Sequence, residues 1–321
     1  MTSESDEQAR HGAGAHAKED LQHASDGTDP DGPLLELEDL DDRVASNDEW
    51  AFRQADRMLA KLPGREGHDR KTEGEVFDKS TLMALHKLLV HGALKSLDFP
   101  VSTGKEANVF RGTTPEGGFV AVKIYRINTA TFKHVLQYIQ GDERFQGITG
   151  DKRSLVYAWA QKEHRNLLRM REAGIDVPEP IRVLQNILIT EYLGVEKGPW
   201  PRLQELGRLA PPVAEAFWQK LCADYVAIYA KAGLVHADFS EYNILVQHAD
   251  RLVDTPAGVD FDPSEGPTAR PRVIDVGQAV LTNHPMTREF VLRDAKNLTG
   301  YFKRQKVRVA PEDLTRLLRT T

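Results

Sequence analysis

Apolar residues recur at helical spacing in five segments of the chain. The first segment, residues 79–97, places five leucines on one face and predicts an amphipathic helix that introduces the folded region. These leucines are Leu82, Leu85, Leu88, Leu89 and Leu94. A second helical pattern begins at Asp151 and stops at Gly174, and a third opens at the pair Pro211-Pro212 and stops at Gly233. Residues 286–305 and 311–319 are also predicted to be helical.

Shorter segments rich in β-branched and aromatic residues predict strands. Residues 99–111 and 118–125 flank a Pro- and Gly-containing turn, which indicates antiparallel pairing. Residues 181–184 and 187–192 predict two more strands of the same small sheet. Two further short strands, 244–246 and 272–274, enclose residues 247–271, which are rich in Asp, Pro and Gly and predict an exposed loop. We expect pairing of these two strands to bring the ends of the loop together.

The order of these elements predicts an α+β protein with two lobes. Residues 79–193 would form a small lobe with an antiparallel sheet and a preceding helix, and residues 194–321 a mainly helical lobe with an insertion at 247–271. Residues 1–78 would form an acidic extension, because residues 1–50 hold 15 Asp and Glu against 3 Lys and Arg. Such a composition buries too little apolar surface to offset the entropy of ordering, so we expect disorder there.

Charge and composition exclude several classes of protein. After residue 50 the chain holds 39 basic and 33 acidic residues, an excess too small to predict sequence-specific DNA binding. The sequence lacks an apolar run of eighteen residues and a secretory signal, which predicts a cytoplasmic protein without membrane contact. The single cysteine, Cys222, lies in an apolar helical pattern and is expected to be a buried hydrophobic residue.

A first candidate for chemistry is the segment His236-Ala-Asp-Phe-Ser-Glu-Tyr-Asn243, between a predicted helix and a predicted strand. An aspartate and an asparagine four residues apart are typical of the catalytic loop of protein kinases. Asp238 would accept the proton of the attacking group, Asn243 would bind a metal ion, and His236 would brace the loop. The spacing alone is also met by ordinary Asn and Asp turns.

A second candidate is Asp275, which follows a predicted buried strand and precedes Gly277. A carboxylate in this context matches the metal-binding aspartate of kinases, which bridges metal ions to the phosphates of ATP. Together with Asn243, it predicts a site for Mg²⁺, with Mn²⁺ as an alternative. Pairing with the upstream loop makes a simple capping role for Asp275 the weaker interpretation.

A third candidate is Lys123, which lies within the apolar strand Val120-Ala-Val-Lys-Ile-Tyr125. A lysine there is either an edge residue or a buried cation that needs a partner. Glu163, in the middle of the following helix, is the preferred partner, while Glu172 and Glu143 remain alternatives. Such a pair would hold the lysine on the α- and β-phosphates.

A fourth candidate is the segment 101–110, placed where kinases carry a glycine-rich loop over the phosphates of ATP. Only one glycine is present. We expect nucleotide contacts from Ser102, Thr103, Gly104 and Lys105. A Walker loop is rejected, because its first glycine and its terminal hydroxyl residue are absent.

Taken together, these motifs resemble the RIO family of atypical protein kinases, most closely its type 1 branch, over roughly residues 80–305. The segments that carry the resemblance are Ser102-Thr-Gly-Lys-Glu-Ala-Asn108, Lys123-Ile-Tyr-Arg126, Tyr138-Ile-Gln-Gly-Asp-Glu-Arg-Phe145, Trp159-Ala-Gln-Lys-Glu-His-Arg-Asn-Leu167, His236-Ala-Asp-Phe-Ser-Glu-Tyr-Asn243 and Ile274-Asp-Val-Gly-Gln278. The resemblance implies a flexible loop over residues 129–150 and an adenine-binding hinge at Glu191 to Leu193.

The resemblance also implies a truncated C-terminal lobe, and 46 residues follow Asp275. Ala237 stands where many kinases have an arginine that pairs with an activation-loop phosphate, so we expect activity without that phosphorylation. Asp275 is further implied to accept a phosphoryl group. The 31 residues between Asn243 and Asp275 exceed the tight hairpin expected of the family.

Three functional hypotheses follow from these residues. The first is an ATP- and metal-dependent serine/threonine protein kinase that acts on itself or on another protein. The second is an ATPase switch that controls association with a small ribosomal subunit precursor. The third is a small-molecule phosphotransferase of the aminoglycoside type, against which the segment 102–108 argues. A scaffold that binds nucleotide without turnover is the least favoured, because the catalytic residues are all present.

Overall fold

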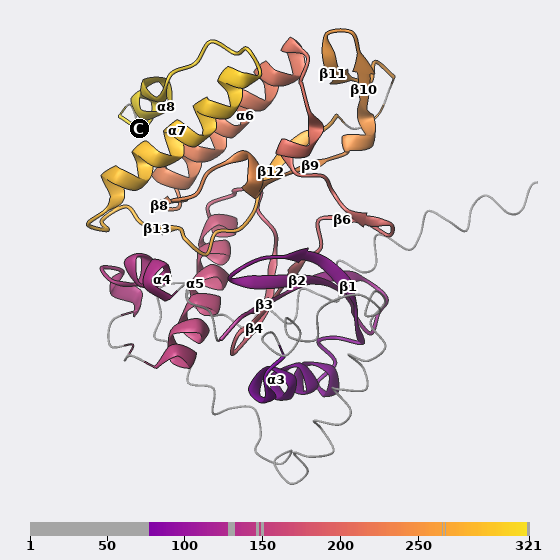
Figure 1. Ribbon diagram of the computed structural model, residues 1–321, viewed down its shortest axis with the longest axis vertical. Helices are drawn as coiled ribbons and strands as arrows, with labels where there is room; N and C mark the ends of the chain where they lie inside the picture. Colours follow the sequence, from indigo (N-terminus) through magenta and orange to yellow (C-terminus); the bar gives the residue numbers. More distant parts are fainter. Residues whose placement is uncertain are drawn as a thin grey trace, which may run out of the picture.

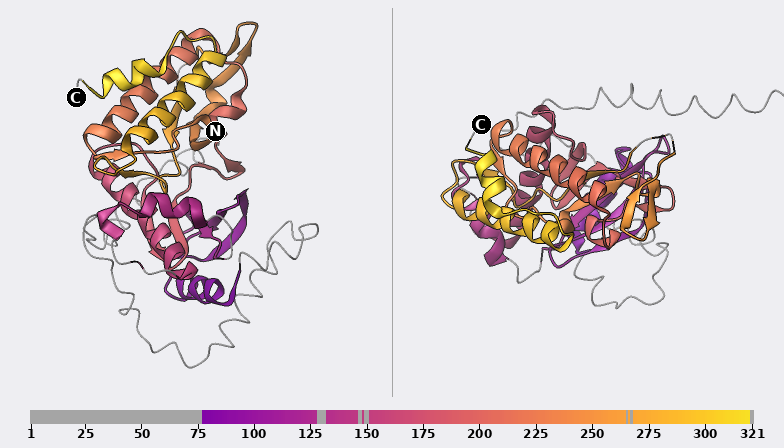
Figure 2. Two further views of the ribbon diagram at one scale, coloured as in Figure 1. Left: turned by 60° about the vertical axis from the view of Figure 1, so that its left-hand side comes forward. Right: turned by 90° about the horizontal axis from the view of Figure 1, so that it is seen from above.

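The computed structural model describes residues 77–127, 132–145, 148, 151–264, 266 and 268–319. In Figure 1 an N-terminal lobe with a sheet lies below a C-terminal lobe dominated by helices. The left view of Figure 2 shows the same division. The acidic extension predicted over residues 1–78 falls almost wholly outside the described residues, and the boundary at 193/194 stays a prediction.

The N-terminal lobe is built on a five-stranded antiparallel sheet of order β1-β2-β3-β5-β4. Its strands are β1 (Ser96–Thr103), β2 (Ala107–Thr113), β3 (Phe119–Tyr125), β4 (Pro180–Leu184) and β5 (Ile187–Glu191). The extended segment predicted over 99–111 is divided into two strands by a tight turn. In this turn the Gly104 amide donates to the Ala107 carbonyl at 3.0 Å, and a Cβ on Gly104 would lie 2.9 Å from that same oxygen.

The two faces of the sheet are covered by different helices. Side chains alternate along β3, so Val122 and Ile124 share one face while Lys123 points to the other. The Val122 face packs with leucines of α3 (Lys79–Val90). This is the predicted amphipathic helix, but it ends seven residues before the predicted bound at residue 97, and residues 96–97 belong to β1. Asp78 caps this helix by accepting a hydrogen bond from the Thr81 amide at 2.8 Å. The opposite face of the sheet meets α5 (Lys152–Glu172).

The segment 129–150 is only partly described, but it includes regular structure. The helix α4 (Phe132–Ile139) and the 3₁₀ turn η5 (Glu143–Phe145) precede α5. Tyr138 stacks on Phe290 of the C-terminal lobe with ring centroids 5.2 Å apart. The described part of this segment is therefore helical and packed, where the resemblance implied a flexible loop.

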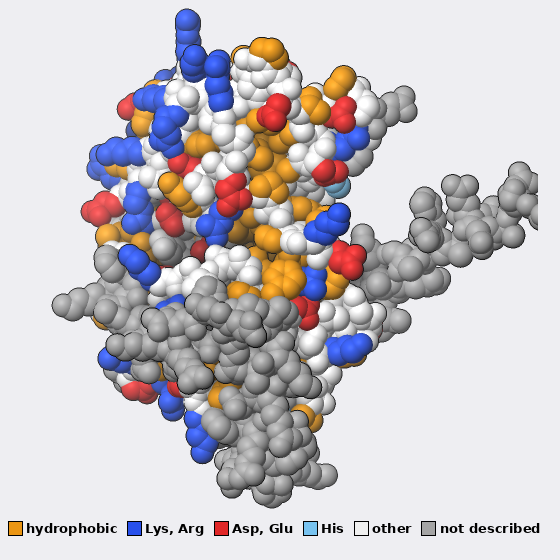
Figure 3. Space-filling model, turned by 45° about the vertical axis from the view of Figure 1, so that its right-hand side comes forward, with side chains coloured by type: hydrophobic (Ala, Val, Ile, Leu, Met, Phe, Trp, Pro, Cys, Tyr) orange, Lys and Arg blue, Asp and Glu red, His pale blue; other side chains and the backbone are white. Residues whose placement is uncertain are grey.

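The C-terminal lobe consists mainly of α6 (Pro211–Ala230), α7 (Thr287–Arg304) and α8 (Pro311–Leu317). All three agree with the predicted helices to within a few residues. Residues 287–319 hold nine Lys and Arg against four Asp and Glu. On the face shown in Figure 3, Lys and Arg side chains gather at the upper left, over this lobe. Among the described helices, none combines the length and apolar character needed to cross a membrane.

Two short strand pairs place the candidate catalytic segments. Strand β9 (Ile244–Gln247) pairs antiparallel with β12 (Arg270–Val273), so the ends of the 247–271 insertion meet as expected. The amide of Ile274 also donates to the Asn243 carbonyl at 2.9 Å. A second pair, β8 (Leu234–Val235) with β13 (Val280–Leu281), joins the residues before one loop to those after the other. The pairing brings the two predicted motifs side by side.

The insertion is not the simple exposed loop that its composition predicted. It contains the hairpin of β10 (Leu252–Thr255) and β11 (Gly258–Phe261), which packs on α6. The Phe261 ring lies 6.2 Å from that of Phe217, and the Ala210 amide donates to the Val259 carbonyl at 2.8 Å. Each strand has only four residues, too few for a period of two to stand out among Asp, Pro and Gly.

We predict that Phe261→Ala lowers the free energy of unfolding by about 2 kcal/mol, somewhat less than for a fully buried phenylalanine. The loss reflects the contact with Phe217, and urea denaturation followed by circular dichroism measures it. Val253→Ala on the same hairpin is the control, since its side chain is 38% exposed and should cost about 0.5 kcal/mol or less. Equal effects of both changes would contradict docking of the hairpin on α6.

Candidate active site

Lys123 lies between two carboxylates that come from different lobes. Its Nζ donates to Glu163 Oε2 at 2.8 Å and Oε1 at 3.0 Å, and to Asp275 Oδ1 at 2.8 Å. The Tyr125 hydroxyl, two residues along β3, also donates to Glu163. Glu163 is therefore the partner of Lys123. Glu172 lies exposed at the end of α5, and Glu143 accepts from Asn283 instead.

The electrostatics of this cluster keep the lysine charged. Burial opposes the charge, but Asp275 and Glu163 raise the pKa of Lys123 above its ordinary value. The pKa of the Asp275 carboxyl is lowered, because the pull of Lys123 outweighs burial. The pKa of Glu163 is raised by burial and by the nearby Asp275. Lys123 and Asp275 thus carry opposite charges near neutral pH.

Asp275 follows β12 with its backbone in the left-handed region, at φ +58°. That conformation is uncommon for a residue with a side chain and is held by its surroundings. Its side chain is 48% exposed and faces the space between the lobes. A side chain at position 277 would crowd Glu163, because a Cβ there would lie 3.0 Å from Glu163 Oε2. The glycine allows the backbone after Asp275 to approach α5.

The predicted catalytic loop is closed by its own side chains. The Asn243 Nδ2 atom donates to the Asp238 backbone oxygen at 3.0 Å and to Asp238 Oδ2 at 2.7 Å. Burial raises the pKa of the Asp238 carboxyl above its ordinary value. Because the amide nitrogen of Asn243 faces Asp238, its amide oxygen faces away from Asp238. That oxygen is the candidate metal ligand of this residue.

His236 braces the loop against the strand that leads to Asp275. Its Nε2 lies 3.2 Å from the Ile274 carbonyl oxygen, and the Asp238 amide donates to its Nδ1 at 3.3 Å. This pattern requires a neutral ring protonated on Nε2. Burial lowers the pKa of His236 to about 4, which keeps that form at neutral pH. The bracing predicted for His236 is thus seen as two hydrogen bonds.

Two anchors of this loop were missed by sequence reasoning, and both come from α7. Asp294 is fully buried and accepts from the amides of Ala237 and Phe239 at 2.8 and 2.9 Å. Burial raises the pKa of Asp294 to about 7. Arg293 donates to the Ala237 carbonyl oxygen. An aspartate among the apolar positions of a helix was the available signal, because such a residue is seldom buried without donors.

The predicted phosphate loop lies at the tip of the turn between β1 and β2. Thr103, Gly104 and Lys105 are exposed there. Ser102 is half-buried, and its Oγ accepts from Arg202 of the C-terminal lobe at 3.0 Å. Arg202, not singled out from the sequence, also helps to lower the pKa of Asp275. The loop is thus tied to the other lobe through Ser102.

The predicted hinge joins the lobes at the end of β5. The Glu191 side chain pairs with both terminal nitrogens of Arg272, each at 3.1 Å, so it is turned away from a nucleotide. Leu193 is buried, and its carbonyl accepts from the Trp200 amide at 3.0 Å. Contact with adenine at Glu191 and Leu193 stays a prediction.

The oxygen ligands fit a magnesium ion shared with a nucleotide. Mg²⁺ is usually bound by one or two carboxylates together with substrate phosphates and water. Asp275 and Asn243 meet this description, because one is an ionised carboxylate and the other presents an amide oxygen. Within the described ranges there is no group of three His, Cys, Asp or Glu that could hold a metal alone.

An apolar pocket in the C-terminal lobe is separate from these residues. It lies between α6, the insertion hairpin and β12, and none of the site residues above lines it. Its floor includes Phe217 and Phe261. The candidate active site is therefore identified by the polar side chains that meet between the lobes, and not by this apolar pocket.

The two-lobed fold, the Lys123 to Glu163 pair and the adjacent Asp238, Asn243 and Asp275 define a protein-kinase-like phosphotransferase. Comparisons with known proteins make the class more specific. The RIO domain matches residues 108–266 and 266–314. The RIO-type serine/threonine-protein kinase Rio1 of Haloferax volcanii is 38% identical over 268 residues, which cover 84% of this chain and 82% of that protein. The chain therefore belongs to the RIO family.

More distant matches agree. The human serine/threonine-protein kinase RIO1 is 34% identical over 243 residues, or 75% of this chain and 39% of that protein. The crystal structure of a Rio2 kinase–ADP/Mg²⁺–phosphoaspartate complex from Chaetomium thermophilum has a TM-score of 0.54 at 18% identity. It covers 87% of this chain and 89% of that chain. At this identity the match shows the fold, which confirms the kinase-like architecture.

We predict that His236 makes the protein less stable as the pH falls below 6.5. In the unfolded chain a histidine takes up a proton near pH 6.5, whereas the folded state resists protonation until about pH 4. The contribution is therefore complete above pH 6.5 and is lost toward pH 4, by up to about 3 kcal/mol. Urea denaturation at pH 7, 5.5 and 4.5 measures it.

The control for this pH dependence is His236→Gln, which keeps polar atoms but does not titrate. Between about pH 4 and 6.5, the number of protons that the chain takes up on unfolding should be lower by close to one in this variant. His164, whose pKa burial also lowers to about 4, should account for part of the remaining dependence. An unchanged pH dependence in the variant would refute the assignment to His236.

Proposed function

We infer that this chain is a RIO-type serine/threonine protein kinase that transfers the γ-phosphoryl group of ATP in the presence of Mg²⁺. The observation that carries the inference is Lys123, which bonds to both Glu163 and Asp275 next to the loop of Asp238 and Asn243. Family membership and the names of the similar Rio1 kinases support it. The aminoglycoside-type alternative has no such support.

In the proposed mechanism Lys123 binds the α- and β-phosphates, and Glu163 with Tyr125 keeps its ammonium group in place. Asp238 orients the attacking hydroxyl and accepts its proton, a role for which a raised pKa is suitable. Asn243 and Asp275 hold the metal. When bound, Mg²⁺ would supply positive charge that stabilises the negative charge built up during transfer.

The nucleotide would lie between the sheet and the C-terminal lobe. Backbone atoms of Glu191 and Leu193 would bind adenine, and residues 102–105 would cover the phosphates. Arg202 is a further candidate ligand for a phosphate, because it is a cation beside Ser102 and within electrostatic reach of Asp275. Mn²⁺ would serve as an alternative metal, since it also prefers oxygen ligands.

A second candidate function is ATP hydrolysis through a phosphorylated aspartate. An oxygen of the Asp275 carboxylate would attack the γ-phosphorus as ADP leaves, and water would then release phosphate and restore the carboxylate. The half-exposed, ionised state of Asp275 favours this reaction. The Rio2 kinase from Chaetomium thermophilum was crystallised as a complex that contains a phosphoaspartate. Such an ATPase could act as a switch.

The partners and the location predicted from the sequence are part of this proposal. Autophosphorylation or a protein substrate is consistent with the kinase assignment, and association with a small ribosomal subunit precursor stays a prediction. We propose a cytoplasmic location. Affinity capture with and without nucleotide, followed by analysis of bound RNA and protein, would test both the partner and the switch.

We predict that Asp238→Ala lowers ATP turnover by roughly 10² or more, because the base and the positioning of the hydroxyl are lost together. A coupled assay for ADP release measures the rate, and circular dichroism verifies folding. Asp250→Ala is the matched control, since Asp250 is an exposed carboxylate in the insertion. Turnover of the Asp238 variant at the wild-type rate would rule out the mechanism.

We predict that incubation with γ-labelled ATP and Mg²⁺ labels the protein, and that the chemistry of the label separates the two candidates. A label on Asp275 is an acyl phosphate, so hydroxylamine should release it and Asp275→Asn should abolish it. A hydroxylamine-resistant label on serine or threonine would instead indicate autophosphorylation. Complete lack of label and of ADP release in the wild type would contradict both.

A further inference from the structure

A buried lysine next to the active site has no role in the mechanism above. Lys162 precedes Glu163 on α5, and its side chain is fully buried. Within the described part of the chain, no carboxylate forms an ion pair with it. Burial and the nearby Arg144 lower the pKa of Lys162 to about 7. A buried amine of this kind is costly unless its hydrogen bonds are used.

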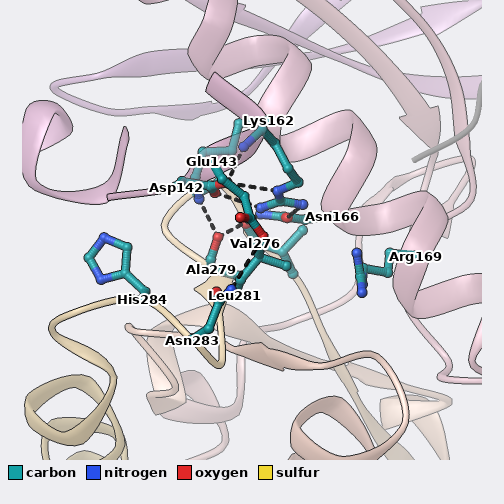
Figure 4. Close-up of polar contacts among 12 residues, drawn as sticks. Asp142, Glu143, Lys162, Asn166, Arg169, Val276, Ala279, Leu281, Asn283 and His284 are labelled. Atoms are coloured by element: carbon teal, nitrogen blue, oxygen red, sulfur yellow. Dashed lines mark hydrogen bonds and ion pairs between the residues drawn. The ribbon is translucent and has the colours of Figure 1, made fainter. Parts of the chain in front are cut away.

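The hydrogen bonds of Lys162 all go to the backbone just after Asp275. Its Nζ donates to the Gly277 carbonyl at 3.1 Å and to the Ala279 carbonyl. Asn166 lies one helical turn further along α5 and is also fully buried. Its Nδ2 donates to the carbonyls of Val276 and Ala279, both at 2.8 Å. Figure 4 shows both side chains pointing at this backbone.

The two side chains are themselves held in place. Asn166 Oδ1 accepts from Arg144 at 3.0 Å, so both its donors and its acceptor are used. Arg144 in turn forms a buried ion pair with Asp142 at 2.7 Å. The residues just before Asp142 also contact the chain beyond Ala279, because His284 Nε2 lies 2.9 Å from the Gln140 carbonyl oxygen. The amide of Asn166 therefore has one orientation available.

These contacts bear directly on the position of Asp275. The left-handed backbone at Asp275 has an intrinsic cost, and it persists only where the neighbouring residues fix it. The next carbonyls, at residues 276, 277 and 279, are fixed by Lys162 and Asn166. The first of these carbonyls belongs to Val276, which directly follows Asp275, so a single peptide bond joins Asp275 to the anchored backbone.

We propose that Lys162 and Asn166 are positioning residues, which fix the backbone after Asp275 and so aim its carboxylate at the metal and at Lys123. The proposal deepens the function inferred above and rests on it for the role of the metal. Because α5 also carries Glu163, one rigid helix sets both partners of Lys123. The position of Asp275 is then coupled to that of α5 without any phosphorylation.

The test compares Asn166→Leu with Asn186→Leu. Asn186 is a matched control, because it is fully buried and its Nδ2 also makes two bonds of 2.8 Å, to Thr81 and to the Tyr125 carbonyl. Three measurements are made on the full chain. They are thermal unfolding, hydrogen exchange of residues 274–281 without ligand, and ADP binding in Mg²⁺ and in EDTA.

We expect both variants to lose similar thermal stability. Only Asn166→Leu should speed hydrogen exchange at residues 276–279. Only this variant should also raise the Mg²⁺ concentration for half-maximal ADP binding, by about tenfold, because a hydrogen bond that orients a metal ligand is lost. Its ADP affinity in EDTA should stay within about twofold of the wild type. Lys162→Met, which replaces a buried amine by an apolar chain, should fold and shift the same two readouts if Asn166→Leu does not fold.

Equal effects of the Asn166 and Asn186 variants on exchange and on Mg²⁺ dependence would overturn the proposal, as would unchanged values in Asn166→Leu and Lys162→Met. Failure of the proposed function gives a different result. The wild type would then bind ADP equally with Mg²⁺ and with EDTA, while hydrogen exchange in the ligand-free protein would still report whether α5 fixes the segment.

Discussion

The constraint on which the rest of the structure depends is the charge of Lys123 on the inner face of a strand. A cation in that position must be compensated, and its two carboxylates come from α5 and from the segment after β12. These elements belong to different lobes, so the lysine fixes one lobe against the other. Asp275 stays ionised beside Lys123, and an ionised carboxylate is the kind of ligand that a magnesium ion prefers.

The remaining parts of the site are held by buried groups whose hydrogen bonds are made within the fold. Both ring nitrogens of His236 are hydrogen-bonded to the backbone, and Asp294 accepts from the amides on either side of Asp238. Each anchor sits in the core of the C-terminal lobe, where low polarity strengthens its hydrogen bonds. The predicted catalytic loop is therefore held by these hydrogen bonds without a ligand, and such preorganisation lowers the cost of reaching a transition state.

The sequence predicted those parts of the fold and site that leave a local signal, either a hydrophobic periodicity or a charged residue in an apolar segment. Long amphipathic helices such as α3 and α5 were found because their periodicity spans several turns. Lys123 and Asp275 were found because a charge in an apolar strand or at its end is conspicuous. The hairpin in 247–271 was missed because its strands are only four residues long. Asp294, Lys162 and Asn166 received no role, because their partners are backbone atoms far away in sequence.

The short segment after Asp275 explains how such a site can be active without an activation loop. Only residues 276–286 separate Asp275 from α7, and the carbonyls of residues 276, 277 and 279 are held by α5. Ala237 stands where an arginine would pair with a phosphate, and Arg293 from α7 donates to the Ala237 carbonyl instead. The carbonyl of Ala237 is thus held by the helix that follows, without any modification of the chain. Arg202, which donates to Ser102 across the lobes at 3.0 Å and helps to lower the pKa of Asp275, adds a further cation to this side of the site.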